Sequence, residues 1–204
     1  FRDITIQRRE DDLVGASFGR GFYILDDISP MRNWDNSMQN AEATVFNTKP
    51  AYWYVQRPEI YGQGNNDYQA KNPPFGAVFT YYLKDQYKSL AETRKESEKE
   101  LNKNKSNVPF PGWDNLDKEL SQNKPSVVLT IRDAAGNVVK HVTGTNTKGF
   151  NRVAWDLTYA DRGGEKLKAK KGGGSFFGGG VMATPGTYTM TLSKVIDGVW
   201  TQLS

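Results

Sequence analysis

The chain has 204 residues, enough for one ordinary domain or for one small domain with part of another. It contains no cysteine, which excludes disulfides, cysteine-ligated zinc and thiol catalysis. Aromatic residues make up 12% of the chain, which argues against general disorder. No apolar run approaches the roughly 18 residues that a membrane span needs.

The net charge of +4 is mild, and much of the basic excess is local. It gathers in one glycine-rich stretch, at Lys166, Lys168, Lys170 and Lys171. A nucleic-acid-binding protein usually carries its basic residues on a structured face with aromatics between them. We therefore interpret these lysines as solvated loop charge and expect no nucleic-acid partner.

Short apolar alternations predict three strands near the N-terminus. Residues 3–7 alternate, and the apolar runs 13–16 and 22–25 flank a glycine turn at residues 19–21. Because a sheet of two or three strands is not stable alone in water, we expect a partner sheet from outside this sequence. The start at Phe1 rather than Met leads us to expect an internal fragment or a cleaved product of a longer protein.

Residues 31–72 lack a regular period, and we interpret them as an aromatic-rich linker. The rings of Tyr52, Trp53, Tyr54, Tyr61 and Tyr68 have two readings. They either form a stacking platform for sugars or anchor the linker against the sheets. Aromatic side chains bury a large area with few rotors, which favours the anchoring role.

The next segment begins with an extended entry and a strand. Pro73 and Pro74 favour an extended backbone, and residues 77–82 follow with Ala77, Phe79 and Tyr81 on one face. Residues 86–105 are rich in Glu and Lys at helical pairing distances and predict an exposed helical insertion.

The chain should return from this insertion through a loop at residues 107–124. We expect Trp113 and Leu116 to pack against the insertion and hold it in place.

The stretch 126–157 should form the centre of the fold. Residues 126–132 alternate as a strand with one buried face, residues 133–137 supply a turn, and residues 138–142 return, which predicts a hairpin. Residues 150–157 form a third strand, with Trp155 as the expected core residue.

Further strands are expected near the C-terminus, at residues 185–192 behind a Pro-Gly turn and at residues 199–203. Between these strands and the centre, the glycine- and lysine-rich segment 160–180 reads as a loop. A phosphate-binding glycine loop needs a helix N-terminus after it, whereas a strand follows here, so we expect no nucleotide site.

Three of these stretches together carry a resemblance to a known family. The string LVGASFGRGFYILDDISPMR resembles the final blade of large bacterial BNR-repeat or sortilin-like β-propeller proteins, which are classed as glycosyl hydrolases. The Asn72-Pro-Pro-Phe-Gly-Ala-Val stretch resembles the entry to their C-terminal sandwich, and residues 181–192 resemble its Pro-Gly-Thr-Tyr strand. The positions kept in the blade string are Gly15, Gly19, Arg20, Leu25, Asp26, Asp27, Ile28, Ser29 and Pro30.

This resemblance implies an all-β fold. We expect an Ig/fibronectin-like antiparallel β-sandwich that follows the last strands of a propeller blade and carries one exposed helical insertion. The expected divisions are blade strands at 1–30, the linker at 31–72 and the sandwich at 73–204. The sequence departs from the family at Ser17 and Phe18, where Thr-His is common, and it lacks the Asp-box spacing.

Catalytic patterns are sparse. His141 is the only histidine, so a histidine metal cluster is excluded and a strand-surface role is expected. A glycosidase needs two carboxyl groups about 5–9.5 Å apart across a sugar. Asp26 and Asp27 are adjacent and point to opposite faces of a strand, so they cannot form that pair alone. We expect one of them to cap the turn that leaves the blade.

Two functions follow from these expectations. The first is a non-catalytic structural module at the C-terminal end of a large exported protein, which closes the propeller and supports partner or surface contacts. The second is part of a carbohydrate-active enzyme or a carbohydrate-binding module. The candidate ligand-binding residues are Arg20, Asp26, Tyr52, Trp53 and Tyr54.

We expect no cofactor, metal or catalytic residue in this chain. The expected partners are the preceding propeller portion and other cell-surface proteins or glycans. The expected location is secreted, cell-surface or periplasmic.

Overall fold

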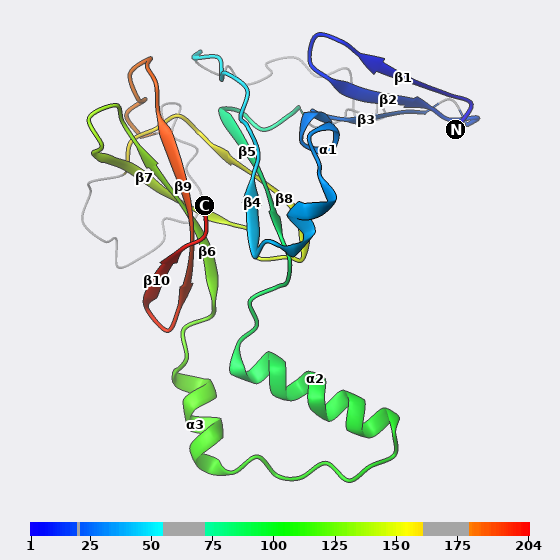
Figure 1. Ribbon diagram of the computed structural model, residues 1–204, viewed down its shortest axis with the longest axis vertical. Helices are drawn as coiled ribbons and strands as arrows, with labels where there is room; N and C mark the ends of the chain where they lie inside the picture. Colours follow the sequence, from blue (N-terminus) through cyan, green and yellow to red (C-terminus); the bar gives the residue numbers. More distant parts are fainter. Residues whose placement is uncertain (20, 55–71, 161–179) are drawn as a thin grey trace, which may run out of the picture.

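A computed structural model describes residues 1–19, 21–54, 72–160 and 180–204. Most of the regular structure is strand, arranged in three antiparallel sheets, so the expected all-β class is confirmed (Figure 1). The sheet orders are β1-β2-β3, β10-β9-β6-β7 and β4-β5-β8. The strands are β1 (Asp3–Gln7), β2 (Asp12–Ala16), β3 (Phe22–Leu25), β4 (Ala43–Val45), β5 (Ala77–Leu83), β6 (Ser126–Arg132), β7 (Val138–Gly144), β8 (Gly149–Trp155), β9 (Thr189–Ile196) and β10 (Val199–Gln202).

Helices are short and lie outside the sheets (Figure 1). They are α1 (Ser29–Arg32), the 3-10 helix η1 (Asn36–Asn40), α2 (Leu90–Lys103) and α3 (Trp113–Ser121). Across the described ranges, no helix is long and apolar enough to cross a membrane.

One hydrophobic core is shared by the sheets β10-β9-β6-β7 and β4-β5-β8. Strand β5 contributes Phe79, Tyr81 and Leu83, and β6 contributes alternate residues from the neighbouring sheet. Trp155 at the end of β8 is 2% exposed, as the sequence predicts, and its indole Nε1 donates to the Thr158 carbonyl at 2.9 Å. This pairing satisfies the one polar group that a buried tryptophan brings into a core.

Strand β6 departs from the expected pattern of one buried face. Val127, Leu129 and Ile131 are fully buried, but Val128 and Thr130 on the opposite face are buried too. The reason is its position between β9 and β7, where it has a neighbour on each side. The predicted hairpin with β7 is confirmed, with Gly136 in its turn at φ +84°.

The segment 31–72, interpreted from the sequence as a linker, also contributes a strand to sheet β4-β5-β8. β4 pairs with β5, and the rings of Trp34 and Phe46 pack over Tyr82 and Phe150 on the outer face of sheet β4-β5-β8. The ring centroids of Trp34 and Tyr82 are 4.6 Å apart. These two aromatic residues, rather than Tyr52 or Tyr54, therefore hold the described part of the segment on the sheet.

The helical insertion is confirmed, but its return path is not a loop. The expected loop at 107–124 contains α3, and Trp113 is exposed instead of packed against the insertion. The two helices are joined by Arg94, which donates to both carboxylate oxygens of Glu119 at 2.7 and 2.9 Å. A paired Arg–carboxylate fork fixes orientation as well as distance, which explains how two polar helices stay together.

Two other boundaries differ from the sequence prediction. α2 begins behind a capping box, in which the Ser89 hydroxyl accepts from the Glu92 amide and Glu92 accepts from the Ser89 amide. β9 begins at Thr189 rather than Pro185, because Tyr188 turns its hydroxyl back to the Thr184 carbonyl at 2.5 Å.

Candidate functional site

Arg152 on β8 makes the contacts that join the exit of the N-terminal sheet to sheet β4-β5-β8. Its guanidinium donates from Nη1 to the Asp26 carbonyl at 2.6 Å and from Nη2 to the Asp27 carbonyl at 2.8 Å. Its Nε donates to the Thr80 hydroxyl on β5 at 3.3 Å. The planar guanidinium presents these donors in a fixed fork, so it sets the angle at which the chain leaves β3.

Asp27 caps the turn that follows β3, which is the role predicted for either Asp26 or Asp27. Its carboxylate accepts from the Ser29 amide at 3.2 Å and from the Ser29 hydroxyl at 2.7 Å, and it forms an ion pair with Lys49 at 3.1 Å. Its backbone is in the left-handed region, with φ +46°, which aspartate tolerates better than most residues.

The same carboxylate is held in its charged form. Burial by itself would raise the pKa of Asp27, but the hydrogen bonds from Ser29 and the nearby Lys49 ammonium outweigh it, so the pKa lies below its ordinary value. A general acid in a glycosidase needs the opposite shift, because it must hold a proton near neutral pH. Asp27 is therefore a structural anion.

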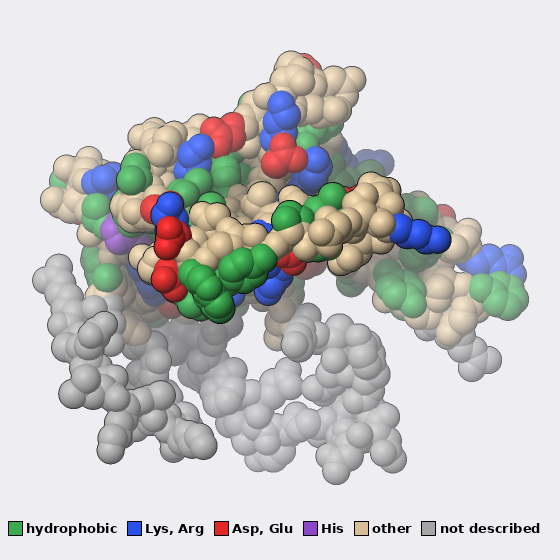
Figure 2. Space-filling view, turned by 90° about the horizontal axis from the view of Figure 1, so that it is seen from below, with side chains coloured by type: hydrophobic (Ala, Val, Ile, Leu, Met, Phe, Trp, Pro, Cys, Tyr) green, Lys and Arg blue, Asp and Glu red, His purple; other side chains and the backbone are tan. Residues whose placement is uncertain are grey.

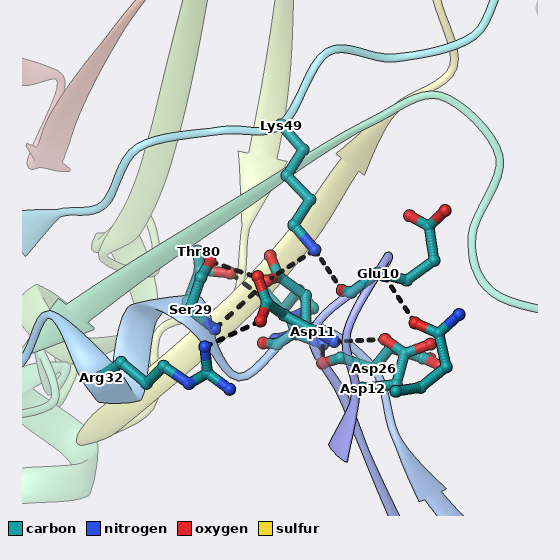
Figure 3. A network of polar contacts seen from close by, with 11 residues as sticks. Glu10, Asp11, Asp12, Asp26, Ser29, Arg32, Lys49 and Thr80 are labelled. Atoms are coloured by element: carbon teal, nitrogen blue, oxygen red, sulfur yellow. Dashed lines mark hydrogen bonds and ion pairs between the residues drawn. The ribbon is translucent and has the colours of Figure 1, made fainter.

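Further contacts fix the preceding turn to the same point. The Asp12 carboxylate accepts from the Asp27 amide at 2.9 Å, and Asp11 forms an ion pair with Arg32 of α1 at 2.9 Å (Figure 3). The Lys49 ammonium also donates to the Glu10 carbonyl. The turn between β1 and β2, the exit from β3 and strand β8 are thus held in one polar network.

A cavity of about 370 Å³ opens beside this network. Its lining includes Asp12, Asp26, Lys49, Tyr52 and Arg152. Two of the predicted ligand-binding residues, Asp26 and Tyr52, are therefore brought together. Within the described residues, the Asp26 carboxylate has no hydrogen bond or ion pair, and only its carbonyl is used, by Arg152.

Trp53 and Tyr54 do not line this cavity. Trp53 lines a second cavity of about 410 Å³, which lies between sheets β4-β5-β8 and β10-β9-β6-β7. Its indole Nε1 donates to the Ala183 carbonyl at 2.9 Å. Tyr54 stands edge-on to Phe75, with ring centroids 5.0 Å apart. Arg20, Tyr61, Tyr68 and most of the 160–180 segment lie outside the described residues.

The aromatic residues at 52–54 therefore do not form one flat platform. Tyr52 is exposed, while Trp53 and Tyr54 are each about half exposed and engaged with different neighbours. His141 lies on the surface of β7 as expected, where Nδ1 is 3.1 Å from the Thr130 hydroxyl and the ring packs on Trp200. In the described ranges, no group of three or more metal-ligating side chains comes together.

Lys49 and Arg152 hold the junction and are not among the site residues predicted from the sequence. Arg152 carries a weak signal, since it is the one basic residue in the strand stretch 150–157. Its partners are carbonyl groups, which no sequence motif marks. Comparisons with family models, curated proteins and solved structures found no match for this chain.

Loss of the Arg152 side chain should loosen the junction while leaving the core intact. We expect Arg152→Met to lower the free energy of unfolding by about 1–3 kcal/mol, because two part-buried carbonyls lose their donors. Limited proteolysis should cut faster between β3 and α1. Lys148→Met is the control, since Lys148 forms a solvent-exposed ion pair with Asp85, and such a pair should contribute little to the free energy of unfolding. Equal unfolding free energies and equal proteolysis rates in the two variants would show that Arg152 does not hold the junction together.

The charge on Asp27 should make the junction sensitive to acid. Because its pKa is lower in the folded chain, Asp27 stabilises the fold above its unfolded pKa, and that contribution is lost as pH falls through about 4 toward the folded value. We expect Asp27→Asn to be less stable than the parent chain at pH 7 and nearly equal to it near pH 2. Urea unfolding at intervals between pH 7 and about 2 measures this, and a difference independent of pH would contradict it.

Proposed function

We propose that this chain is the C-terminal region of a large exported β-propeller protein. In this role it is a non-catalytic structural module that completes the propeller, closes it and supports partner or surface contacts. The proposed location is secreted, cell-surface or periplasmic.

The observation that carries the proposal is the N-terminal sheet, in which strands β2 and β3 are apolar on both faces. Cross-strand pairing puts Ile4 and Tyr23 beside Gly15 on one face, and the next row pairs Ile6, Leu13 and Leu25. The opposite face carries Val14 with Ile24 and Ala16 with Phe22 on β2 and β3, while β1 adds the polar Thr5 and Asp3 to these two rows. Phe22 is 76% exposed and Ile24 is 63% exposed.

A sheet with this pattern needs a cover on each side. Antiparallel sheets with one wet face alternate apolar and polar residues, whereas sheets buried on both faces carry apolar residues throughout. Blades of a propeller pack against a neighbouring blade on each face, and the preceding part of the protein would also cover the sheet edges. No other described segment covers these two faces, since Ile4, Phe22, Tyr23 and Ile24 all remain exposed.

We further propose that sheets β4-β5-β8 and β10-β9-β6-β7 form an Ig/fibronectin-like sandwich. The support is a single core to which both sheets contribute, with Tyr81 and Trp155 from one and Leu129 and Leu192 from the other. The junction through Arg152 supports the module's role as a rigid spacer, because it fixes the blade-like sheet to this sandwich.

The mass of the natural polypeptide tests the proposal. Immunodetection with an antibody against this chain, followed by intact mass measurement, should find a protein much larger than 22.9 kDa in an exported fraction. A natural product of about this mass would overturn the propeller assignment, because no upstream sheet would then exist to cover β1–β3.

A second candidate function is carbohydrate binding, favoured by the exposed rings at Tyr52 and Trp53 and the cavities beside them. Sugars stack on exposed aromatic rings and bind polar groups at their rim. Glycan-array binding by the chain, lost in Tyr52→Ala and in Trp53→Ala but kept in Trp200→Ala, would favour this function. Absence of binding to every glycan would leave the structural role as the function of this chain.

A further inference from the structure

A cavity opens into the core between sheets β4-β5-β8 and β10-β9-β6-β7, and we call it the inter-sheet cavity. Its volume is about 410 Å³, within the range of about 300–1,000 Å³ that small-molecule sites occupy, and every residue that lines it belongs to the described ranges. Hydrophobic side chains gathered along α2 and α3 face solvent, as Figure 2 shows from below. The apolar side chains of the inter-sheet cavity instead surround a space of ligand size.

The inner wall of the inter-sheet cavity is the hydrophobic core itself. Five of the lining residues belong to the core and are at most 8% exposed: Phe79, Ile131, Trp155, Leu157 and Ala183. Protein interiors pack to high density, with few voids larger than a water molecule. An open space against these residues therefore leaves apolar surface without packing partners, which an apolar ligand would supply.

The aromatic residues of the cavity offer their rings rather than free polar groups. The indole Nε1 of Trp53 and that of Trp155 each donate to a backbone carbonyl at 2.9 Å, and the Tyr188 hydroxyl donates to the Thr184 carbonyl at 2.5 Å. With Phe79, four rings line the cavity. Aromatic rings pair favourably edge-on or offset, as Trp155 and Tyr188 do with centroids 5.0 Å apart. A ring system in the cavity would find partners of the same kind.

Neutral hydroxyl groups lie at the rim of the cavity. Thr48, Thr187 and Thr189 line it and are exposed, and within the described ranges their hydroxyls make no hydrogen bond. The hydrogen bond from Trp53 to the Ala183 carbonyl ties together the two segments that carry these threonines. The cavity thus has polar groups at its edge and apolar groups inside, which is the usual arrangement of a small-molecule site.

Lys49 is the one charged residue among those that line the cavity, all of which the structure describes. Its ammonium pairs with Asp27 at 3.1 Å and donates to the Glu10 carbonyl. A charged ligand would therefore find no free counter-ion here, and burial of an unpaired charge is costly. A sugar inside the cavity would leave most of its hydroxyls against apolar side chains, without hydrogen-bond partners. The lining favours an uncharged, apolar ligand over both.

We propose that the inter-sheet cavity binds a small, uncharged aromatic molecule. Its ring system lies against the rings of Phe79, Trp155 and Tyr188, and a polar group on it bonds the threonine hydroxyls at the rim. This site is separate from the cavity beside Asp26 and Tyr52. The proposal goes beyond the structural role, and it holds whether or not this chain ends a propeller.

Isothermal titration calorimetry of the 204-residue chain with indole tests the proposal. We expect one saturable site per chain with a Kd of about 1 mM or lower, since so small a ligand has few atoms with which to offset the cost of association. Indole-3-acetate, which adds a carboxylate to the same ring system, should bind at least about tenfold more weakly, because its charge finds no free counter-ion. Glucose should not compete with indole.

Variants that fill the cavity test the position of the site. Ala51→Leu and Ala183→Val each add side-chain volume to the lining, so each should weaken indole binding at least about fivefold. Circular dichroism checks that both variants stay folded. Tyr52→Ala is the matched control and should bind indole as the parent chain does, because Tyr52 precedes Trp53 in the chain but lines the other cavity.

NMR of the parent chain locates the site without any variant. The indole N–H signals of Trp53 and Trp155 should shift as indole is added, whereas those of Trp113 and Trp200, which do not line the cavity, should stay in place. Absence of saturable binding up to the solubility limit of indole would overturn the proposal. So would shifts confined to Trp113 or Trp200, competition by glucose, or equal affinity for indole-3-acetate.

Discussion

Replacement of Trp155 by alanine should lower the free energy of unfolding by about 3–5 kcal/mol, the largest effect of any core substitution in this chain. Trp155 is nearly inaccessible, packs edge-on against Tyr188 with centroids 5.0 Å apart, and donates to the Thr158 carbonyl. Its removal leaves a cavity between the sheets and a carbonyl without its donor. Urea unfolding followed by circular dichroism measures the change.

Trp200→Ala is the matched control for this substitution. Trp200 lies on β10, about half exposed, and packs on the His141 ring at the surface. Its removal should cost about 1 kcal/mol or less, because it leaves no cavity in the core. Similar losses for the two variants would mean that the core is not centred on Trp155.

Gly76→Ala should be about as damaging, by a different mechanism. Gly76 precedes β5 at φ +105°, and a Cβ at this position would lie 1.9 Å from the Trp155 carbonyl oxygen. A backbone atom in a sheet cannot move aside, so the clash adds to a backbone strain of about 1–3 kcal/mol. We expect a loss of at least about 3 kcal/mol or failure to fold, measured by the urea midpoint and soluble yield.

Gly136→Ala separates the two parts of that cost. Gly136 also has a positive φ, +84°, but no atom lies within 4 Å of where its Cβ would be. This variant should therefore show the backbone strain alone. If Gly76→Ala is no worse than Gly136→Ala, the close approach to Trp155 does not limit the fold.

Features set by neighbours in the chain were predictable. The three N-terminal strands and the hairpin of β6 and β7 follow from period-2 alternation and from turn residues such as Gly136, which act over a few positions. Trp155 was predictable as a core residue because it is the large apolar residue at the end of such a pattern. The capping box at the start of α2 could also be predicted locally, because Ser89 is followed three residues later by Glu92.

Features set by distant contacts were not predictable. Arg152 bonds the carbonyl of a residue 126 positions away, and nothing local marks that carbonyl. The second buried face of β6 depends on β9, more than fifty residues later. Helix α3 was hidden by Pro109, Pro111 and Gly112, which indicate a loop, although Trp113, Leu116 and Leu120 carry a helical spacing.

The junction and the helical insertion divide the surface of this chain into two roles. Around Arg152 and Asp27, charged groups face one another and fix the N-terminal sheet in place. Around Trp113 and Leu120, an apolar surface is left exposed. The first arrangement suits a spacer that transmits position, and the second suits a contact with another molecule.

Hydrogen exchange of the β2 and β3 amides tests the central proposal, that another part of a larger protein covers β1–β3. It should be measured in this chain and in the natural polypeptide under the same conditions. We expect strong protection of these amides in the natural protein and fast exchange in the isolated chain, while the amides of β5 and β6 stay protected in both. Equal exchange of β2 and β3 in the two samples would contradict it, because the sheet would then be uncovered in both.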